Sequence, residues 1–475
     1  MNLKINYSYI GIAIFTFFFF FWGVDIKENF LNLYSPEHQT SYYLDKKQLN
    51  KLQGSYFRLS YLIILLIIPI FYSFLKKGLS SFAQIFNYQR YIIFFTLFII
   101  AHYFFVKVYY NTIIDKSEIA NLAYLVLLSV IYCHYRNFIF LNFKKILTVY
   151  LIIFVFFSIY ETSQFRNYNI GQCHRNIFLI QLIQDYLKIS LSNSIYIENS
   201  HLAMMSIAVF FSCVYILVRS KKINILFLLL FSIEVIIVLN NLSTTYFVCY
   251  FFAQITLLLF FLKRINIKFW IVTILLLLIN SYLIFSDKNC TVKVTDFKVN
   301  DVINENLIKS GTNLTTLIYK RSAILALQTL KDQSLGWGID GMNNATQNFM
   351  SKYNTDLCFK NRISGERCSH KDIFRWYGET KTKRAHWSLR YLNTKDGLSN
   401  SLKMITEFGI FSFIIIFIFI KYILNIRNIN SYNVFIIILF VTMCIRGVGY
   451  FNGGFIFCLL EFFYYKKFSM NLNSK

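Results

Sequence analysis

Long runs of apolar residues, separated by shorter polar segments, dominate this chain. A helix needs about 20 mostly apolar residues to cross a bilayer, and about twelve runs approach that length. The chain is 56% hydrophobic and 15% charged, and only two of its 475 residues are prolines, which is unlike a soluble protein of this size. The sequence therefore predicts an all-α integral membrane protein with about twelve transmembrane helices. The predicted spans are 8–24, 57–75, 91–109, 119–135, 145–161, 200–218, 223–241, 244–262, 268–286, 402–422, 431–446 and 450–465.

The loops between these runs alternate in charge. One set is short, basic and nearly free of acids, which is typical of cytoplasmic loops. The other set is longer or mixed in charge, so twelve spans with both termini in the cytoplasm are self-consistent. The first run has no small-residue cleavage site, and we expect a retained helix rather than a signal peptide. The basic loops contain Lys76, Lys77, Arg90, Arg136, Lys144, Lys145, Arg219, Lys221, Lys222, Lys263, Arg264, Lys268, Lys421, Arg427, Lys466 and Lys467.

The longest loop divides the chain into three regions. Residues 1–286 form a transmembrane region of about nine spans, 287–401 a large periplasmic loop, and 402–475 a region of about three spans. The loop is basic on the side where the positive-inside rule predicts no excess of cations. It either binds an anion, such as a pyrophosphate, phospholipid or acidic glycan, or is a solvated lysine-rich loop. Within it, 316–331 has helical spacing and 336–341 predicts a tight turn.

Net charge and cysteines exclude some classes of function. A charge of +25 suggests a nucleic-acid partner in a soluble protein, but here the cations lie between apolar runs and favour contact with lipid headgroups. No nucleic-acid-binding motif is found, and no His/Cys cluster has the spacing of a metal site. We expect no nucleic-acid partner, no metal and no cofactor. Cys358 and Cys368 either form a small disulfide loop or remain free.

Charged residues near the ends of spans are costly there and are candidates for function. Glu198 and His201 are three residues apart and would share a helix face, where they could move a proton or bind a sugar hydroxyl. The alternative is a helix start capped by Asn199 or Ser200. Asp25, directly after the first span, is an alternative acid.

Several further candidates lie in or beside the large loop. The guanidinium of Arg321 could bind a phosphate, or the side chain could simply extend its charge to the membrane–water interface. Glu407 and Asp396 could bind a sugar or act as a base, although an acid in a first helical turn can also simply complement the helix dipole. Arg446, in a glycine-rich segment, and Arg175 could bind an anionic headgroup or pyrophosphate.

Four segments together resemble the Wzy-type O-antigen polymerases and, more distantly, the O-antigen ligases. IENSHLAM resembles a Glu-Pro-Ser-His-x-Ala segment, with Asn199 in place of proline. NNLSTTYFV is similar to the start of the following span, RSAILALQTLKDQSLGWGIDGM to an arginine-led helix ending in Gly-x-Gly, and DGLSNSLKMITEFGIFSF to the return into the membrane. The likeness covers roughly 195–455. Ligases typically carry a His-Asn pair before the glutamate that corresponds to Glu407, but the matching positions here are near Leu398 and Ser399. The resemblance therefore favours a polymerase. It leaves the identity of the general base open.

The resemblance implies a glycosyl transfer at the periplasmic face of the bacterial inner membrane. A growing glycan would move from undecaprenyl pyrophosphate to a lipid-linked repeat unit, and cations would stabilise the leaving pyrophosphate. Arg321 is the first candidate for that role and Arg446 the second, while Glu198, His201 or Glu407 would deprotonate or orient the acceptor. Expected partners are the lipid-linked oligosaccharide, membrane lipids and a chain-length regulator protein. An O-antigen ligase or a flippase of the same glycan is the alternative.

Overall fold

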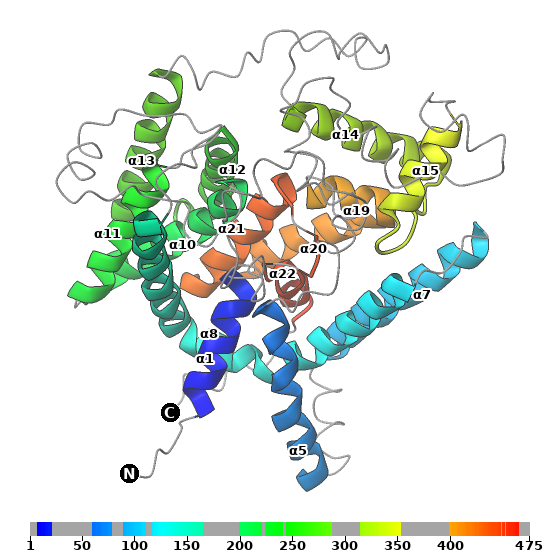
Figure 1. The fold of residues 1–475 in the computed structure, drawn as a ribbon, viewed down its shortest axis with the longest axis horizontal. Helices are drawn as coiled ribbons and strands as arrows, with labels where there is room; N and C mark the ends of the chain where they lie inside the picture. The colour runs from blue at the N-terminus through cyan, green and yellow to red at the C-terminus, as the bar shows by residue number, and fades with distance from the viewer. Residues whose placement is uncertain are drawn as a thin grey trace.

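The computed structural model describes a set of helices connected by segments that are not described. The described residues are 7–20, 59–77, 89–110, 116–164, 199–220, 224–240, 244–286, 314–352, 399–447, 449–451 and 453–464. Every regular element within these ranges is helical (Figure 1). The fold class is therefore all-α, as the sequence predicts.

Apart from α8, the N-terminal elements match the predicted spans to within a few residues. They are α1 (Tyr7–Phe20), the 3-10 helix η1 (Leu59–Leu66), α5 (Ile67–Lys77), α7 (Arg90–Tyr109) and α8 (Lys116–Gln164). The next four are α10 (Asn199–Arg219), α11 (Ile225–Asn240), α12 (Thr244–Phe261) and α13 (Ile267–Ser286). Apolar runs bounded by Lys, Arg or Asn therefore define these elements well.

The helix α8 differs from the prediction of two separate spans. It is continuous over 49 residues and includes the basic stretch 136–144 that was expected to be a loop. A straight helix of this length would extend roughly 74 Å, more than twice the apolar thickness of a bilayer. Figure 1 shows that α8 instead changes direction, with its first part beside α7 and its later part running up beside α11. The helix contains neither proline nor glycine.

The C-terminal elements are α14 (Leu314–Asp332), α15 (Met342–Lys352), α19 (Asn400–Phe408), α20 (Phe411–Asn425), α21 (Ser431–Ile445) and α22 (Phe455–Phe462). α14 confirms the helix expected at 316–331. α15 was not expected, because its sequence is mostly polar. The predicted span 402–422 is divided at Gly409, whose φ of 54° ends α19 before the apolar α20 begins.

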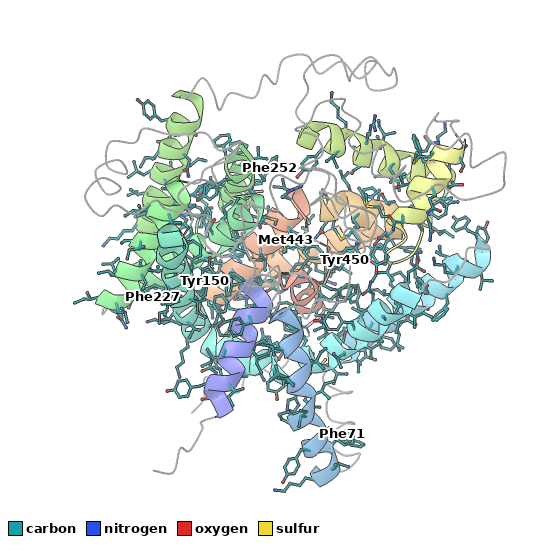
Figure 2. All side chains as sticks on the ribbon, viewed as in Figure 1. Phe71, Tyr150, Phe227, Phe252, Met443 and Tyr450 are labelled. Atoms are coloured by element: carbon teal, nitrogen blue, oxygen red, sulfur yellow. The ribbon has the colours of Figure 1, made fainter. Side chains whose placement is uncertain are left out.

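α21 lies at the centre of the bundle and packs against α10, α12, α19 and α22 (Figure 1). Aromatic rings fill much of the adjoining core, as where Phe18 of α1 lies 4.7 Å from Phe457 of α22. Figure 2 shows Tyr150 and Met443 inside the bundle and Phe71 at its periphery, where this side chain is 59% exposed. Large apolar side chains are thus found both in the core and on the outer surface.

Two described helical stretches are long and apolar enough to cross a bilayer, by length and composition. They are α7 and the part of α8 from Glu118 to Phe156. Further apolar helices of 10–17 residues include α1, α11, α13, α20 and α21 over most of their lengths. The structure thus gives a helical, partly apolar protein, which is consistent with insertion into a membrane.

Three of the segments predicted to be cytoplasmic meet at one end of the bundle. Arg219, after α10, donates to the carbonyl of Ile429 at 3.2 Å. Arg264, after α12, donates to the carbonyl of Ile426 at 2.5 Å. α21 starts at this end, capped by the Asn430 side chain, and its other end lies near α14 (Figure 1). These basic segments and α14 are therefore at opposite ends of α21.

Candidate functional site

The turn between α14 and α15 docks tightly against α19. The backbone amide of Trp337 donates to the Thr406 carbonyl at 3.1 Å, and that of Gly338 to the Glu407 carbonyl at 2.8 Å. Gly336 has a φ of 81°, and a Cβ at this position would overlap the Glu407 carbonyl. Glycine is needed here both for the backbone conformation and for the close approach.

A buried cluster of one ammonium and two carboxyl groups forms at this joint, and we call it the Lys403 triad. Nζ of Lys403 lies 3.3 Å from Oδ1 of Asp340 and 3.8 Å from Oε1 of Glu407. The side chains of Lys403 and Glu407 are 1% and 0% exposed, and that of Asp340 is 7% exposed. Lys403 also lies over the ring of Tyr450, 4.7 Å from its centroid, and Asn121 of α8 donates to Asp340.

The position of Glu407 favours its protonated form. α19 has nine residues, too few to cross a bilayer. Burial raises the pKa of Glu407 to about 8, the nearby Lys403 opposes that shift, and the Asp340 carboxylate adds to it. Since Lys403 is closer to Asp340, the simplest charge state near neutral pH is a Lys403–Asp340 ion pair beside a neutral Glu407.

A second buried network joins α15 to the N-terminal helices. Lys107 of α7 forms an ion pair of 2.8 Å with Glu118 of α8, and both side chains are 6% exposed or less. The Tyr103 hydroxyl donates to the same carboxylate at 2.7 Å, and the Asn344 amide of α15 at 3.4 Å. Together with the contact between Asn121 and Asp340, this network fixes the turn and α15 on α7 and α8.

Arg446 lies beside the first half of α14. It is 9% exposed and follows the last residue of α21. Its guanidinium bonds to the hydroxyl of Tyr319, which itself donates to the Ile445 carbonyl at 2.5 Å. Burial raises the pKa of Tyr319 to about 12, and Arg446 opposes that shift. Tyr319 is therefore a neutral hydroxyl that holds the arginine near α14.

The start of α19 ties the Lys403 triad to the segment that contains Arg446. The Ser399 and Ser401 hydroxyls donate to the Cys444 carbonyl at 2.6 and 2.8 Å. The side chain of Asn400 accepts from the amide of Gly449 at 3.1 Å. A Cβ on Gly447 would overlap Asn400. The Lys403 triad and Arg446 are thus parts of one packed unit at the same end of α21.

The predicted site residues fall into two groups. Glu407 and Arg446 are brought to this unit, and Arg321 is a partly buried residue of α14, two positions from Tyr319. Glu198, Asp396, Arg175, Asp25, Cys358 and Cys368 lie outside the described residues, and His201 lies in α10 with a side chain that is not described. Glu407 has no exposed surface, so in this conformation it does not meet a sugar hydroxyl.

Asp340 and Lys403 were missed by sequence reasoning. They are 63 residues apart, and no local pattern links an acid in a glycine-rich turn to a lysine in the next apolar segment. One signal was present, because Lys403 falls within the predicted span 402–422, where an ionisable residue is costly. Among the described residues, no group of three or more His, Cys, Asp or Glu could hold a metal ion.

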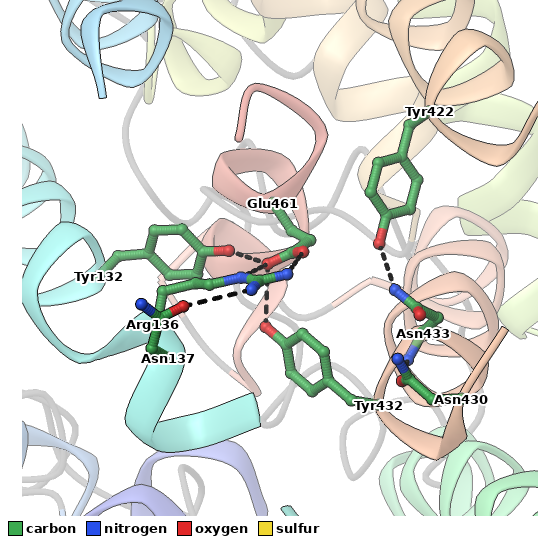
Figure 3. Close-up of polar contacts among 8 residues, drawn as sticks. All are labelled: Tyr132, Arg136, Asn137, Tyr422, Asn430, Tyr432, Asn433 and Glu461. Carbon is green, nitrogen blue, oxygen red and sulfur yellow. Dashed lines mark hydrogen bonds and ion pairs between the residues drawn. The ribbon is translucent and has the colours of Figure 1, made fainter. Parts of the chain in front are cut away.

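A third buried ion pair lies near the other end of α21 (Figure 3). Arg136 of α8 is 2.7 Å from Oε1 of Glu461 in α22. The hydroxyls of Tyr132 and Tyr432 also donate to this carboxylate. Each polar group in this cluster has a partner, which is the pattern expected of a structural contact between helices.

Comparisons of this chain with family models, curated proteins and solved structures gave no match.

Proposed function

We propose that the chain is embedded in a membrane, with the large loop on the outer side. The outward faces of several helices carry large apolar side chains, whereas soluble monomers rarely expose extensive apolar patches. On α13 alone, Ile271, Leu275, Leu278 and Tyr282 are each more than half exposed. Lipid tails are the surroundings that such faces require, and the cationic segments at one end of the bundle fit the cytoplasmic surface.

We further propose that the protein is a polysaccharide polymerase of the Wzy type in the bacterial inner membrane. It would transfer a growing glycan from undecaprenyl pyrophosphate to a lipid-linked repeat unit. One observation carries the proposal: two segments that resemble this family, the Gly-x-Gly turn after α14 and the return segment in α19, meet in the buried Lys403 triad. They are joined to Arg446 through the contacts of α19 with the end of α21. Residues far apart in sequence thus form one polar unit at the end where the large loop begins and ends.

In the proposed reaction, the acceptor hydroxyl attacks the anomeric carbon of the donor and the bond to the lipid pyrophosphate breaks. Negative charge develops on the leaving phosphate, and fixed cations stabilise it. Arg446, held by Tyr319, and Arg321 on α14 are the proposed cations. Glu407 acts as a positioning residue, because the docked turn 333–341 buries its side chain. The base that accepts the hydroxyl proton is proposed to be Glu198 or His201.

The test is a deletion strain complemented with single variants and analysed on lipopolysaccharide or capsule gels. Deletion should remove the ladder and leave one repeat unit attached. Arg321→Ala and Arg446→Ala should reproduce that pattern, whereas Lys331→Ala, an exposed control on α14, should give a normal ladder. A normal ladder with both arginine variants would exclude the proposed cation site.

The same gels separate the polymerase from its two rivals. A ligase joins the finished glycan to its acceptor, and a flippase supplies the glycan to the outer face. Loss of every repeat unit in the deletion strain would therefore indicate one of these functions. A ladder that is unchanged by deletion would reject all three.

A further inference from the structure

The bundle of α10 to α13 contains an acidic residue that the proposed reaction does not use. Glu234, on α11, lines a small internal cavity together with Ser206 of α10 and Tyr246 of α12. The rest of the lining is apolar: Phe210, Val235, Val238 and Leu276. Glu234 and Ser206 are each 1% exposed, and Tyr246 is 2% exposed. A carboxyl group thus lies in a mostly apolar cavity inside this bundle.

Glu234 differs from the other buried acids in having no cationic partner among the described residues. Glu118 is paired with Lys107, and Glu461 with Arg136. Within the described part of the chain, Glu234 forms no ion pair, and its Oε1 has no hydrogen-bond partner. A lone carboxylate in such surroundings is so costly that the group takes up a proton instead.

The groups that face Glu234 from the neighbouring helices are neutral. They are the Ser206 hydroxyl and the Cys213 thiol of α10 and the Tyr246 hydroxyl of α12, with the Asn280 amide of α13 next to Tyr246. α8 also packs against α11, but among the described side chains it contributes none to the lining of this cavity. The space between the lining side chains is too small for a water molecule, and a bound water needs both room and polar partners. The arrangement therefore suits a proton bound to the carboxyl group rather than a hydrated metal ion.

We propose that Glu234 is a proton-binding site within the membrane, independent of glycan transfer. The carboxyl holds its proton in the closed bundle and exchanges it with water when α10 to α13 separate transiently. Glu234 is nine residues into α11, about 14 Å along a helix that rises 1.5 Å per residue. That places it near the middle of an apolar layer about 30 Å thick, where an ionisable residue is a candidate for proton binding or transfer.

Infrared spectroscopy of the full chain in lipid vesicles at pH 7 tests the proposal. The carbonyl stretch of a protonated carboxylic acid is distinct from that of a carboxylate. We expect one such band to disappear in Glu234→Gln and to remain in the control Asp332→Asn, which alters an exposed carboxylate paired with Lys352. Glu407→Gln should remove a separate band, so the two acids can be distinguished. Transfer to D2O should shift the Glu234 band.

Two results would overturn the proposal. If the wild-type and Glu234→Gln spectra are the same, Glu234 is ionised and has a partner. If its band is present but does not shift in D2O over days, the acid is buried and does not exchange. Should Glu234→Gln fail to fold, Glu234→Asp keeps an acid and should retain a band at a shifted frequency. These outcomes do not depend on the ladder assay, so either proposal can fail alone.

Discussion

Replacement of Lys403 with methionine would remove the ammonium from the Lys403 triad and keep most of the apolar side chain. The Asp340 carboxylate would then be 7% exposed and without its cation, although Asn121 would still donate to it. The Lys403 triad joins α19 to the turn 333–341. The loss of stability would therefore appear first at this joint. We expect the turn to separate from α19 more often while the rest of the bundle stays folded.

The size of the effect follows from the burial of both partners. Removal of one partner of a buried ion pair costs about 3–5 kcal/mol. The contact with Asn121 places the expected value near the lower end. At 1.4 kcal/mol for each factor of ten, about 3 kcal/mol makes the open form roughly a hundredfold more populated.

Amide hydrogen exchange of the full chain in lipid nanodiscs measures this opening directly. The amides of Trp337 and Gly338 bond to carbonyls of α19, so they exchange only when the joint opens. In Lys403→Met they should exchange roughly a hundredfold faster, and amides in α21 should not change. The double variant Lys403→Met/Asp340→Asn should recover part of the protection, because it removes the isolated charge.

The control is Lys352→Met, which breaks the ion pair with Asp332. The side chains of this pair are 49% and 21% exposed, and exposed pairs contribute about 0–1 kcal/mol. Exchange at the joint should therefore rise less than about fivefold. If Lys403→Met gives no larger change than this control, the Lys403 triad does not stabilise the docked turn.

Three further predictions concern pH, glycine geometry and the inner ion pair. The pKa of Glu407 is raised from 4.5 to about 8, so its protonated form stabilises the joint. Protection of the Gly338 amide from hydrogen exchange should therefore be greatest below about pH 4.5, fall as the pH rises and level off above about pH 8. Glu407→Gln should flatten this pH profile. Gly409→Ala should increase protease cleavage near residue 409, because a Cβ would overlap the Ser334 carbonyl. Glu461→Gln should lower the thermal midpoint in detergent, since Arg136 loses its buried partner, and adding Arg136→Met should restore part of it.

The apolar pattern predicted most of the helices, because length and hydrophobicity alone define them. α14 and the turn after it were also predicted, since helical spacing and a cluster of glycines are local signals. α15 was missed because its sequence, MNNATQNFMSK, carries little apolar periodicity and the helix is held by tertiary contacts such as Asn344 to Glu118. The division of span 402–422 at Gly409 depends on docking with Ser334, which no local pattern reveals.

The candidate site was only partly predictable for the same physical reason. Glu407 and Arg446 were selected because charged residues near apolar runs are costly wherever they lie. The rule applies equally to Lys403 and Glu234, which also fall within predicted spans but were not selected. What the sequence does not encode locally is the partner of each charge: Asp340 for Lys403, and no cation for Glu234 within the described residues.

Whether a buried charged residue has an oppositely charged partner distinguishes structural residues from functional candidates in this bundle. The buried pairs Lys107–Glu118 and Arg136–Glu461 are each neutral and hydrogen-bonded, so they join helices without adding net charge to the interior. The Lys403 triad is neutral only while Glu407 keeps its proton, and it seals the joint between the large loop and the helices. Titration of Glu407 would therefore weaken the joint that brings α14, with Arg321, towards Arg446. Proton release at this one carboxyl would thus loosen the proposed phosphate site, while the two neutral pairs would leave the rest of the bundle intact.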